Sequence, residues 1–446
     1  MKNIVEHIFR NADRSAPALI CGETEFSYGQ LVDLADAAAR AIGAVPAARV
    51  GLECPNGVTH VVLALAIVRA GKCLVPIAGE LAPPERERVL RETGVGAMVR
   101  EDGSIEPISL AKELPFDEGA LAQLNPAFIR FSSGTTGHSK GIVLSHAGLF
   151  ERVTAANRGL GISPSDRVVW VLPMAHHFAV SIMLYLLHGA ATVIVDSHLP
   201  ADILAAGRSH RGTVLYGAPF HHAALAAEGS ANPWPYLRLA VSTAAPLREE
   251  TALAFLSRYG LPLTQGLGII EVGLPLLNLT SAREKPQSVG RPMPGYAAEI
   301  REGELLLRGP GLLDAYLHPW RTRETILDDG WFHTGDLAGQ DADGDIFIEG
   351  RAHSVINVAG LKCFPEEIEQ VLCEHAAVKQ ARVFGKTNTR AGAVPVAEIV
   401  PADLTAPPSV AGLVAHCRAA LAGYKVPVDF RFVENLALTP SGKIKR

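Results

Sequence analysis

A segment rich in glycine and hydroxyl side chains constrains this chain more than any other feature. It runs from Phe131 to Gly141 and reads F-S-S-G-T-T-G-H-S-K-G. Apolar residues at 127–129 and 142–144 flank it and indicate a buried strand on either side. Glycine permits positive φ and close approach of the backbone to an anion, and successive N–H groups in such a loop form an anion-binding concavity. The segment therefore predicts a phosphate-binding loop in a nucleotide-using enzyme.

The spacing within this loop differs from that of the Walker A motif. That motif needs G-x-x-x-x-G-K-[ST], whereas Gly134 and Gly137 stand closer together here and Lys140 is followed by a glycine. The alternative interpretation is a flexible surface linker, and the apolar flanks argue against it.

Length and composition set the frame for the other motifs. A chain of 446 residues predicts two or three domains, and 48% hydrophobic residues suffice for sizeable cores. A net charge of −5 gives no reason to expect nucleic acid or an anionic membrane as a partner. The six cysteines form no C-x-x-C pair, and residues 1–10 lack the layout of a signal peptide. Polar residues interrupt the apolar region 178–195, so we expect a helix and a strand there rather than membrane insertion. The scattered cysteines favour a cytoplasmic protein.

The order of sequence patterns indicates the fold class. Helical and strand patterns alternate over residues 1 to about 125 and again after residue 167, which predicts an α/β fold with helix-covered sheets. Ser27 is expected to cap a helix that reaches Ile42, and the segment 105–124 is expected to include loop. Short strand patterns with glycine turns follow residue 295, and the last ninety or so residues indicate a small α+β unit.

The segment from Ser132 to Gly141 also matches a longer pattern throughout, S-[ST]-G-[ST]-T-G-x-x-K-G. It resembles the phosphate-binding signature of the adenylate-forming superfamily, which includes acyl- and aryl-CoA synthetases, peptide-synthetase adenylation domains and luciferases. Further blocks in family order extend the resemblance over nearly the whole chain. The resemblance implies a large N-terminal domain of helix-covered sheets with a β-rich subdomain, and a small, mobile α+β C-terminal domain.

The resemblance also implies how ATP is bound. Ser242–Leu247 resembles an adenine-contacting loop, Gln265–Glu271 aligns with Q-x-Y-G-x-T-E, and Trp331–Asp336 matches W-[FY]-x-T-G-D. Glu271 would hold Mg²⁺ against the phosphates, and Thr136, Glu271 and Lys443 are expected to act in catalysis. The implied nucleotide-binding residues are Ser132, Ser133, Gly134, Thr135, Thr136, Gly137, Lys140, Ala244, Ala245, Pro246, Gly266, Leu267, Asp336 and Arg351.

Three positions depart from the family pattern. Leu267 stands where an aromatic ring usually stacks on adenine, and Ile270 stands where a threonine hydroxyl usually meets phosphate. Ala359 replaces a usual basic residue. Losing one hydrogen bond to a charged group costs about 1.5–3 kcal/mol. We therefore expect weaker ATP binding, or a tuned or degenerate site.

The residues that the resemblance brings to the acid substrate are mostly apolar. Val171–Phe178 looks like the P-x-x-H-x-F block, whose histidine, His176, would border the acyl pocket. Thr243 replaces the usual glycine and is expected to narrow the pocket. No aspartate follows the block to pair an amino group, which disfavours amino acids. The expected substrate-binding set, suited to an aryl or short- to medium-chain fatty acid, is His176, Phe178, Phe220, Thr243, Gly268 and Leu274.

The C-terminal blocks imply a hinge and a catalytic lysine. Arg351 ends a G-R block, and the family hinge position two residues later is His353 here. We therefore expect an N-terminal domain at residues 1–351 and a mobile C-terminal domain at 352–446. Thr439–Ile444 resembles the terminal block in which Lys443 would bridge the acid's carboxylate and the α-phosphate.

Together these residues predict two half-reactions, formation of acyl-AMP from an acid and Mg-ATP and transfer of the acyl group to a thiol. CoA is the expected acceptor, and the phosphopantetheine of a separate acyl carrier protein is the alternative. A third hypothesis from another class is a degenerate nucleotide-binding regulator, which Leu267, Ile270 and Ala359 support. The retained Lys140, Glu271, Asp336 and Lys443 argue against it.

Overall fold

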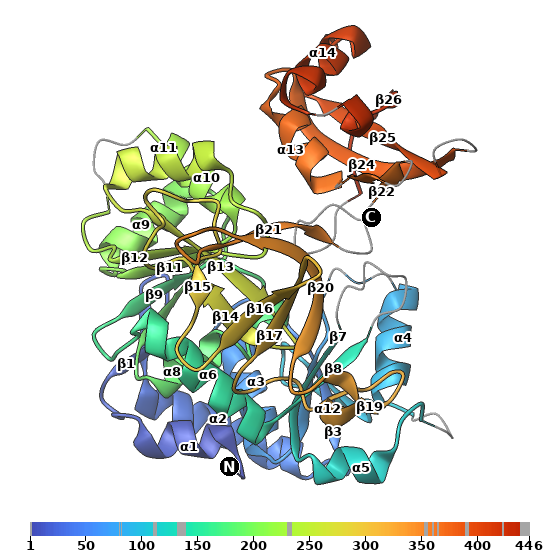
Figure 1. Ribbon diagram of the computed structural model, residues 1–446. Helices are drawn as coiled ribbons and strands as arrows, with labels where there is room; N and C mark the ends of the chain where they lie inside the picture. Colours follow the sequence, from blue (N-terminus) through green and yellow to red (C-terminus); the bar gives the residue numbers. More distant parts are fainter. Residues whose placement is uncertain are drawn as a thin grey trace. The chain divides into compact units, whose positions relative to one another are not determined.

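The structure is a computed structural model, and it describes residues 2–79, 81, 83–109, 114–131, 140–229, 234–351, 356–358, 361–363, 365–388, 392–421 and 423–437. Within these residues the chain forms two compact units (Figure 1). The first unit comprises residues 2–131, 140–298 and 307–332, and the second comprises residues 299–306 and 333–437.

A nine-stranded sheet forms one half of the first unit, and its central strands run parallel. The central strands β9, β10, β11 and β12 are short and almost wholly buried, which is typical of a parallel sheet covered on both faces. In spatial order they are β15 (Arg291–Pro292), β14 (Gly273–Leu277), β13 (Leu263–Ile269), β12 (Leu239–Ser242), β11 (Val214–Gly217), β9 (Arg167–Trp170), β10 (Ala191–Ile194), β1 (Pro17–Cys21) and β2 (Thr24–Ser27).

Three helices cover one face of this sheet, at the upper left of Figure 1. Val169 and Leu215 of the sheet pack there against Ile203, Leu225 and Phe255, one from each helix, and all five are at most 1% exposed. Burying such side chains contributes about 1.5–3 kcal/mol each. The helices are α9 (Pro200–Ser209), α10 (Pro219–Ala227) and α11 (Glu249–Tyr259).

An eight-stranded sheet forms the other half of the first unit. Helices α4 (Pro83–Thr93) and α5 (Glu118–Gln123) supply Val89 and Leu121 to a core that also contains Val75 and Ile129 of the sheet. In spatial order the strands are β19 (Arg321–Thr322), β18 (Ala315–Tyr316), β8 (Gly141–Ser145), β7 (Pro126–Phe131), β4 (Cys73–Pro76), β3 (Arg49–Glu53), β5 (Ala97–Arg100) and β6 (Ile105–Pro107).

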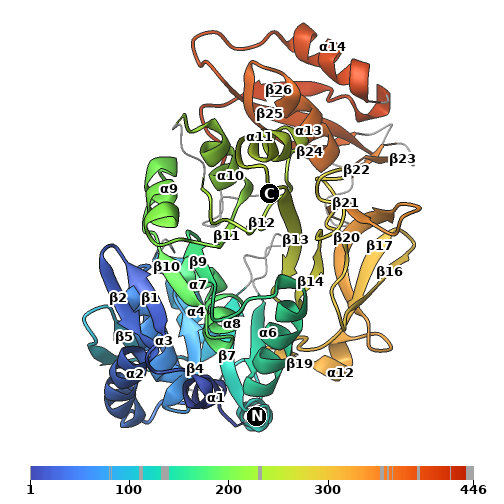
Figure 2. The ribbon, with the colours of Figure 1, turned by 90° about the vertical axis from the view of Figure 1, so that its left-hand side faces the viewer.

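Helix α6 (His146–Leu160) contacts both sheets, through β14 on one side and β7 and β8 on the other (Figure 2). Ser145 caps its start by accepting a hydrogen bond from Gly148 N. Further helices of this unit are α1 (Ile4–Asn11), α2 (Tyr28–Gly43), α3 (Val58–Arg69), α7 (Met174–His177), α8 (Ile182–Leu187) and α12 (Arg323–Ile326).

Arg152 of α6 holds the turn after β13 and the segment before β18 through hydrogen bonds. It is 1% exposed, and its guanidinium donates to the carbonyl oxygens of Gly311 at 2.6 and 2.9 Å and of Ile270 at 2.7 Å. Burial lowers the pKa of Arg152 to about 10, so the side chain stays charged at neutral pH. The helix thereby fixes the turn that carries Glu271 and the segment that leads into β18.

Replacing Arg152 by methionine is expected to destabilise the protein by about 3 kcal/mol. The variant removes the donors to two carbonyl oxygens, those of Gly311 and Ile270, and each unsatisfied buried group costs about 1–3 kcal/mol. Denaturant unfolding followed by fluorescence measures the change. Arg158→Met on the same helix is the matched control, since Arg158 is exposed. Equal stability of the Arg152 variant and the wild type would contradict this role.

The second unit contains two further sheets and two helices. A four-stranded sheet has the order β16 (Ala297–Arg301), β17 (Glu304–Arg308), β20 (Phe332–Gln340) and β21 (Ile346–Arg351). The C-terminal sheet has the order β23 (Leu361–Cys363), β22 (Ile356–Val358), β25 (Gly392–Pro401) and β24 (Val378–Asn388), with β26 (Asp429–Phe432) paired to β25. It packs against α13 (Pro365–Glu374) and α14 (Val410–Ala420), and a 3₁₀ turn covers Gly423–Lys425.

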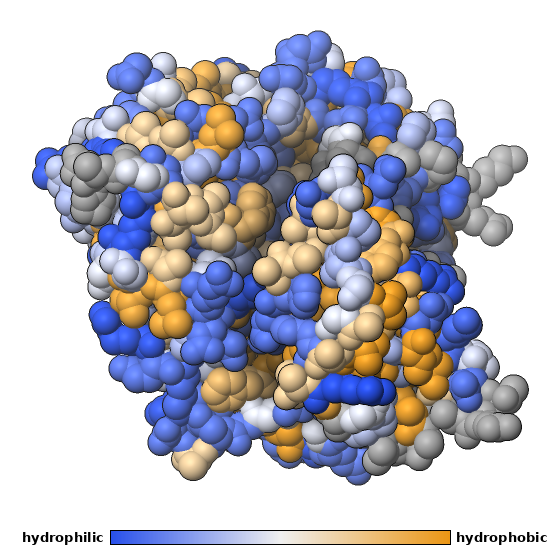
Figure 3. All heavy atoms as spheres, turned by 90° about the horizontal axis from the view of Figure 1, so that it is seen from above, coloured by the Kyte–Doolittle hydropathy of each residue, from blue (hydrophilic) through white to orange (hydrophobic). Residues whose placement is uncertain are grey.

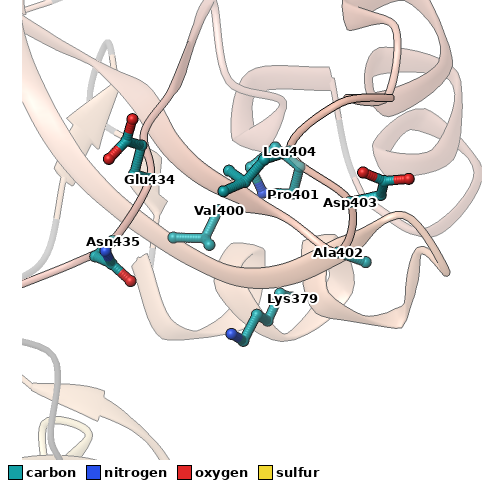
Figure 4. A pocket seen from close by; sticks show the side chains of 8 residues that line it. All are labelled: Lys379, Val400, Pro401, Ala402, Asp403, Leu404, Glu434 and Asn435. Carbon is teal, nitrogen blue, oxygen red and sulfur yellow. The ribbon is translucent and has the colours of Figure 1, made fainter.

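A hollow of about 540 Å³ lies on this C-terminal sheet (Figure 4). Its charged groups, Lys379, Asp403 and Glu434, lie on different sides of the opening and do not converge on one point. The hollow therefore lacks the arrangement of a catalytic site.

The expected fold class is confirmed, with an α/β unit of helix-covered sheets and a smaller α+β unit at the C-terminal end. The expected helix from Ser27 is α2, capped reciprocally by Ser27 and Gln30. Residues 105–124, expected to include loop, also contain β6 and α5. Among the described residues, no helix combines the length and apolar character needed to cross a membrane. Hydrophilic and hydrophobic residues are interspersed over the face drawn in Figure 3.

Candidate functional site

The predicted site residues of the first unit gather where parallel strands of the nine-stranded sheet end. Strand β9 leads to the segment with His176, β12 ends at Ser242 just before Thr243, and β13 contains Leu267 and ends before Glu271. The carboxyl ends of parallel strands meet at one edge of a sheet, where α/β proteins bind ligands. This edge of the sheet is the candidate active site.

The segment with His176 is held at both ends. At its start, the Asn56 side chain accepts a hydrogen bond from Met174 N at 2.8 Å and donates to Leu172 O at 3.2 Å. At its end, Arg130 Nη1 donates to the carbonyl oxygen of His176, and Arg130 Nη2 lies 3.4 Å from His176 Nδ1. The His176 ring is therefore positioned by backbone and side-chain contacts from two other segments.

Thr243 closes one side of the site. It is 4% exposed, its amide donates to Gly217 O at 3.0 Å, and its hydroxyl hydrogen-bonds to the phenol of Tyr216. Burial raises the pKa of Tyr216 to about 12, so the phenol stays protonated. A Cβ placed on Gly268 would lie 3.6 Å from the Thr243 hydroxyl oxygen. Thr243 thus fills space that a glycine would leave open.

Replacing Thr243 by glycine is expected to shift preference toward larger acids by about 10-fold or more in kcat/KM. The reason is that one methylene in an enzyme pocket is worth about 10–200-fold in selectivity. Rates with acids of increasing size measure the shift. Thr243→Ser is the matched control, because it keeps the hydroxyl that bonds Tyr216. An unchanged size preference in the glycine variant would contradict the narrowing role.

The loop after β12 has a strained backbone. Ala244 has φ +72°, a left-handed conformation that costs a residue with a Cβ about 1–2 kcal/mol. Ala245 and Pro246 are exposed, and the Gln265 side chain accepts a hydrogen bond from Leu247 N at 3.2 Å. The loop is therefore anchored to β13, with its exposed backbone available to a ligand.

Glu271 lies in the turn between β13 and β14 and is held through both backbone and side chain. Its carbonyl oxygen accepts from Leu313 N at 2.7 Å, and its Oε1 accepts from the Tyr316 hydroxyl at 3.2 Å. Burial and the nearby Glu271 charge raise the pKa of Tyr316 far above its usual value, so the phenol remains a donor. The Lys140 ammonium lies 4.6 Å from the centroid of the Tyr316 ring. Tyr316 thus connects the end of the glycine-rich segment with the carboxylate of Glu271.

Arg130 is a site residue that the sequence analysis missed. It precedes Phe131 on β7, and its guanidinium contacts His176 as described above. Burial lowers its pKa to about 10, and the charge of Glu271 acts in the opposite direction. A basic residue inside the apolar run before the loop was the signal that could have identified it.

The apolar residues expected in the acyl pocket lie in different environments. Leu274 and Phe178 are buried, and the Phe178 ring packs 6.1 Å from that of His60. Phe220 is 52% exposed, with its ring 3.7 Å from that of His221. No contact between the two phenylalanines is described, so a role for both in one pocket stays a prediction. Leu267 is half-buried and Gly268 exposed at the end of β13.

In the second unit, Asp336 is 3% exposed on β20. It lies directly opposite Arg351 of β21 in the antiparallel pair. The Thr334 hydroxyl accepts a hydrogen bond from Asp336 N at 3.0 Å and donates to Leu305 O at 2.7 Å. The structure therefore brings the two residues expected at the ribose to adjacent strands.

Several expected residues lie outside the described part of the chain. They are Ser132, Ser133, Gly134, Thr135, Thr136 and Gly137 of the loop, the hinge residue His353, Ala359 and the catalytic lysine Lys443. Their roles stay predictions.

Comparison with known proteins decides the family. The pattern of the AMP-binding enzyme family matches residues 7–317, and that of the AMP-binding enzyme C-terminal domain matches residues 367–443. The chain belongs to this family of AMP-binding enzymes. The expected membership of the adenylate-forming superfamily is thereby confirmed, as is the expectation of an AMP-forming ligase.

Several curated relatives of this AMP-binding enzyme are named as CoA ligases. A feruloyl-CoA synthase from Amycolatopsis sp is 28% identical over 96% of this chain and 94% of its own length. A sulfoacetate–CoA ligase from Cupriavidus necator is 30% identical over 81% of this chain and 76% of its own length. The o-succinylbenzoate CoA synthetase from Bacillus subtilis, solved with its acyl-adenylate intermediate, shares the fold with a TM-score of 0.87 at 23% identity, covering 100% of this chain and 97% of that one.

Proposed function

We propose that this AMP-binding enzyme activates a small carboxylic acid with Mg-ATP and transfers the acyl group to CoA. The observation that carries the proposal is the arrangement around Tyr316, which hydrogen-bonds Glu271 and lies beside Lys140. Tyr316 thereby links Glu271, the carboxylate expected to hold the metal, to Lys140, the lysine expected at the phosphates. The CoA ligases among the relatives support the same chemistry.

In the first half-reaction the acid's carboxylate attacks the α-phosphorus of ATP, and pyrophosphate leaves. Positioning and charge neutralisation dominate such a step. The loop Ser132–Gly137 with Lys140 would hold the phosphates, the loop Ala244–Pro246 and Leu267 the adenine, and Asp336 with Arg351 the ribose. Lys443 would neutralise charge on the reacting oxygens.

Glu271 offers carboxylate oxygens, which are the ligands Mg²⁺ prefers. Its surroundings fit this role, since Tyr316 and the backbone contacts hold the carboxylate in place. When bound, the ion would neutralise charge on the ATP phosphates. Leu267 and Ile270 supply neither an aromatic ring nor a hydroxyl there, so ATP is expected to bind more weakly than in relatives that have both.

The domain boundary expected near residue 352 and the hinge expected at His353 would allow the domain motion of the second half-reaction. The C-terminal domain, residues 352–446, would turn about His353, remove Lys443 and open a path for the thiol. The thiol sulfur then attacks the acyl carbonyl, and AMP leaves. CoA is the proposed acceptor, the phosphopantetheine of a carrier protein is the alternative, and the cytoplasm is the proposed compartment.

The proposed substrate is an aryl or a short- to medium-chain acid. Thr243, which is buried and hydrogen-bonds Tyr216, would restrict the depth of the pocket, and the buried Leu274 is expected to line it. The relatives named for ferulate and sulfoacetate show that CoA ligases of this kind differ widely in their acids. The size and charge of the acid that this protein prefers must therefore be measured directly.

The test is pyrophosphate release with Mg-ATP and a panel of aryl, short-chain and medium-chain acids. CoA and a phosphopantetheinylated carrier protein are compared as acceptors. Acid-dependent release followed by thioester formation with CoA is the expected result, and faster transfer to the carrier would favour the alternative acceptor. ATP binding without release for any acid would contradict the proposal and favour a regulatory nucleotide-binding protein.

A further inference from the structure

Arg130 is a charged side chain near the site that the proposed chemistry does not use. Its neighbours Ile129 and Phe131 pack in the core of the eight-stranded sheet. Because successive side chains of a strand point to opposite faces, Arg130 points away from that core. Ile142 and Tyr316 lie opposite it on the next two strands, so Arg130 and Tyr316 share the face on which Tyr316 meets Glu271.

His176 engages part of the Arg130 guanidinium. Nη1 donates to the carbonyl oxygen of His176, and Nη2 lies 3.4 Å from its ring. Arg130 Nε is buried and has no hydrogen-bond partner in the part of the chain that the structure describes. A guanidinium presents its five donors in a rigid planar fork. The Nε–H of the fork is therefore a buried donor that no acceptor satisfies within the described residues.

The charge of Arg130 lacks a direct counter-ion. Within the described residues, no ion pair joins Arg130 to a carboxylate, and Glu271 acts on it only through the longer-range field. Under the proposed function, Glu271 is committed to the metal, Lys140 to the phosphates and Lys443 to the reacting carboxylate. An uncompensated buried charge is strongly destabilising. Arg130 therefore remains without a partner when the part of the acid substrate beyond its reacting carboxylate is uncharged.

We propose that Arg130 binds a second anionic group, a carboxylate or sulfonate, on the acid substrate. The enzyme then prefers acids with two anionic groups over acids of the same size with one. This inference rests on the proposed function. A carboxylate or sulfonate can accept from Nε–H and a neighbouring N–H of the fork at once. The contact with His176, the residue expected at the acyl pocket, favours the tail of the acid over the ATP phosphates as the ligand.

The test uses stable acyl-adenylate analogues in matched pairs. Acylsulfamoyl adenosines of glutarate and valerate, and of terephthalate and benzoate, differ within each pair mainly by one carboxylate. Titration calorimetry gives their Kd for the wild type, Arg130→Met, Arg130→Lys and the matched control Arg14→Met, whose exposed side chain pairs with Asp33. In at least one of the two pairs, we expect the wild type and Arg14→Met to bind the analogue with the additional carboxylate about 10- to 150-fold more tightly than the analogue without it. Arg130→Met should abolish this ratio, and Arg130→Lys should keep part of it, because it retains charge without the fork.

Three results would overturn the assignment. The wild type could show no preference in either pair, the preference could survive in Arg130→Met, or that variant could lose affinity equally for both members of a pair. Equal loss would place Arg130 at the reacting carboxylate or the phosphates. In each of these three cases the analogues still bind, so the proposed ligase function is not contradicted. Failure of all analogues to bind, together with no pyrophosphate release, would contradict both the ligase function and the role of Arg130. Unchanged melting temperatures of the variants exclude unfolding as the cause.

Discussion

Replacing Lys443 by alanine is expected to lower acid-dependent pyrophosphate release by about 10³-fold. In the proposed first half-reaction, negative charge develops on the oxygens that the Lys443 ammonium would bridge. Removing one donor aimed at such charge costs about 10²–10³-fold in rate, and the loss of a full positive charge favours the upper end. The measurement is the initial rate of pyrophosphate release at saturating Mg-ATP and acid.

Lys445→Ala is the matched control, since it removes a basic residue from the same terminal segment. It should keep the wild-type rate of release. When acyl-AMP is supplied directly, Lys443→Ala should still form the thioester, because Lys443 is removed from the site in the second half-reaction. A Lys443 variant with the wild-type rate of release, or equal losses in both lysine variants, would contradict the assignment.

The sequence predicted the architecture because local patterns and burial agree in the sheets. The apolar flanks of the glycine-rich loop are strands β7 and β8, and the helix expected after Ser27 begins at Tyr28. The short helix Glu118–Gln123 was not expected. It is six residues long, so its apolar residues span too few turns for a periodic signal, and Asp117 stabilises it through a cap to Ala120 N.

The candidate site was predictable only in part, for a different reason. Glu271 and Lys140 stand in motifs, but their connection through Tyr316 depends on an antiparallel pair formed by distant segments, β8 and β18. The contact of Arg130 with His176 likewise joins residues 46 positions apart. Phe220 was expected in the pocket from its apolar character alone; the structure leaves it half-exposed, and its role stays a prediction. Motifs specify residue types, whereas tertiary packing decides which of those residues meet.

Replacing Glu271 by glutamine is expected to lower kcat/KM for adenylation by about 10²–10³-fold and to raise the Mg²⁺ concentration needed for half-maximal rate. The amide has nearly the shape of the carboxylate and can still accept from Tyr316, so the turn between β13 and β14 should persist. What it lacks is the negative charge that holds a divalent cation. The role therefore depends on charge, and structural damage would appear separately as a lower melting temperature.

The measurement is pyrophosphate release over a titration of Mg²⁺ at fixed ATP. Glu249→Gln, at an exposed position in the first turn of α11, is the matched control and should follow the wild-type curve. Tyr316→Phe should lie between the two, because it leaves Glu271 charged but removes the hydrogen bond that orients it. A Glu271 variant whose Mg²⁺ dependence equals that of the wild type would show that the metal is held elsewhere. The arrangement of Lys140, Tyr316 and Glu271 would then serve only to fix Lys140 beside β18.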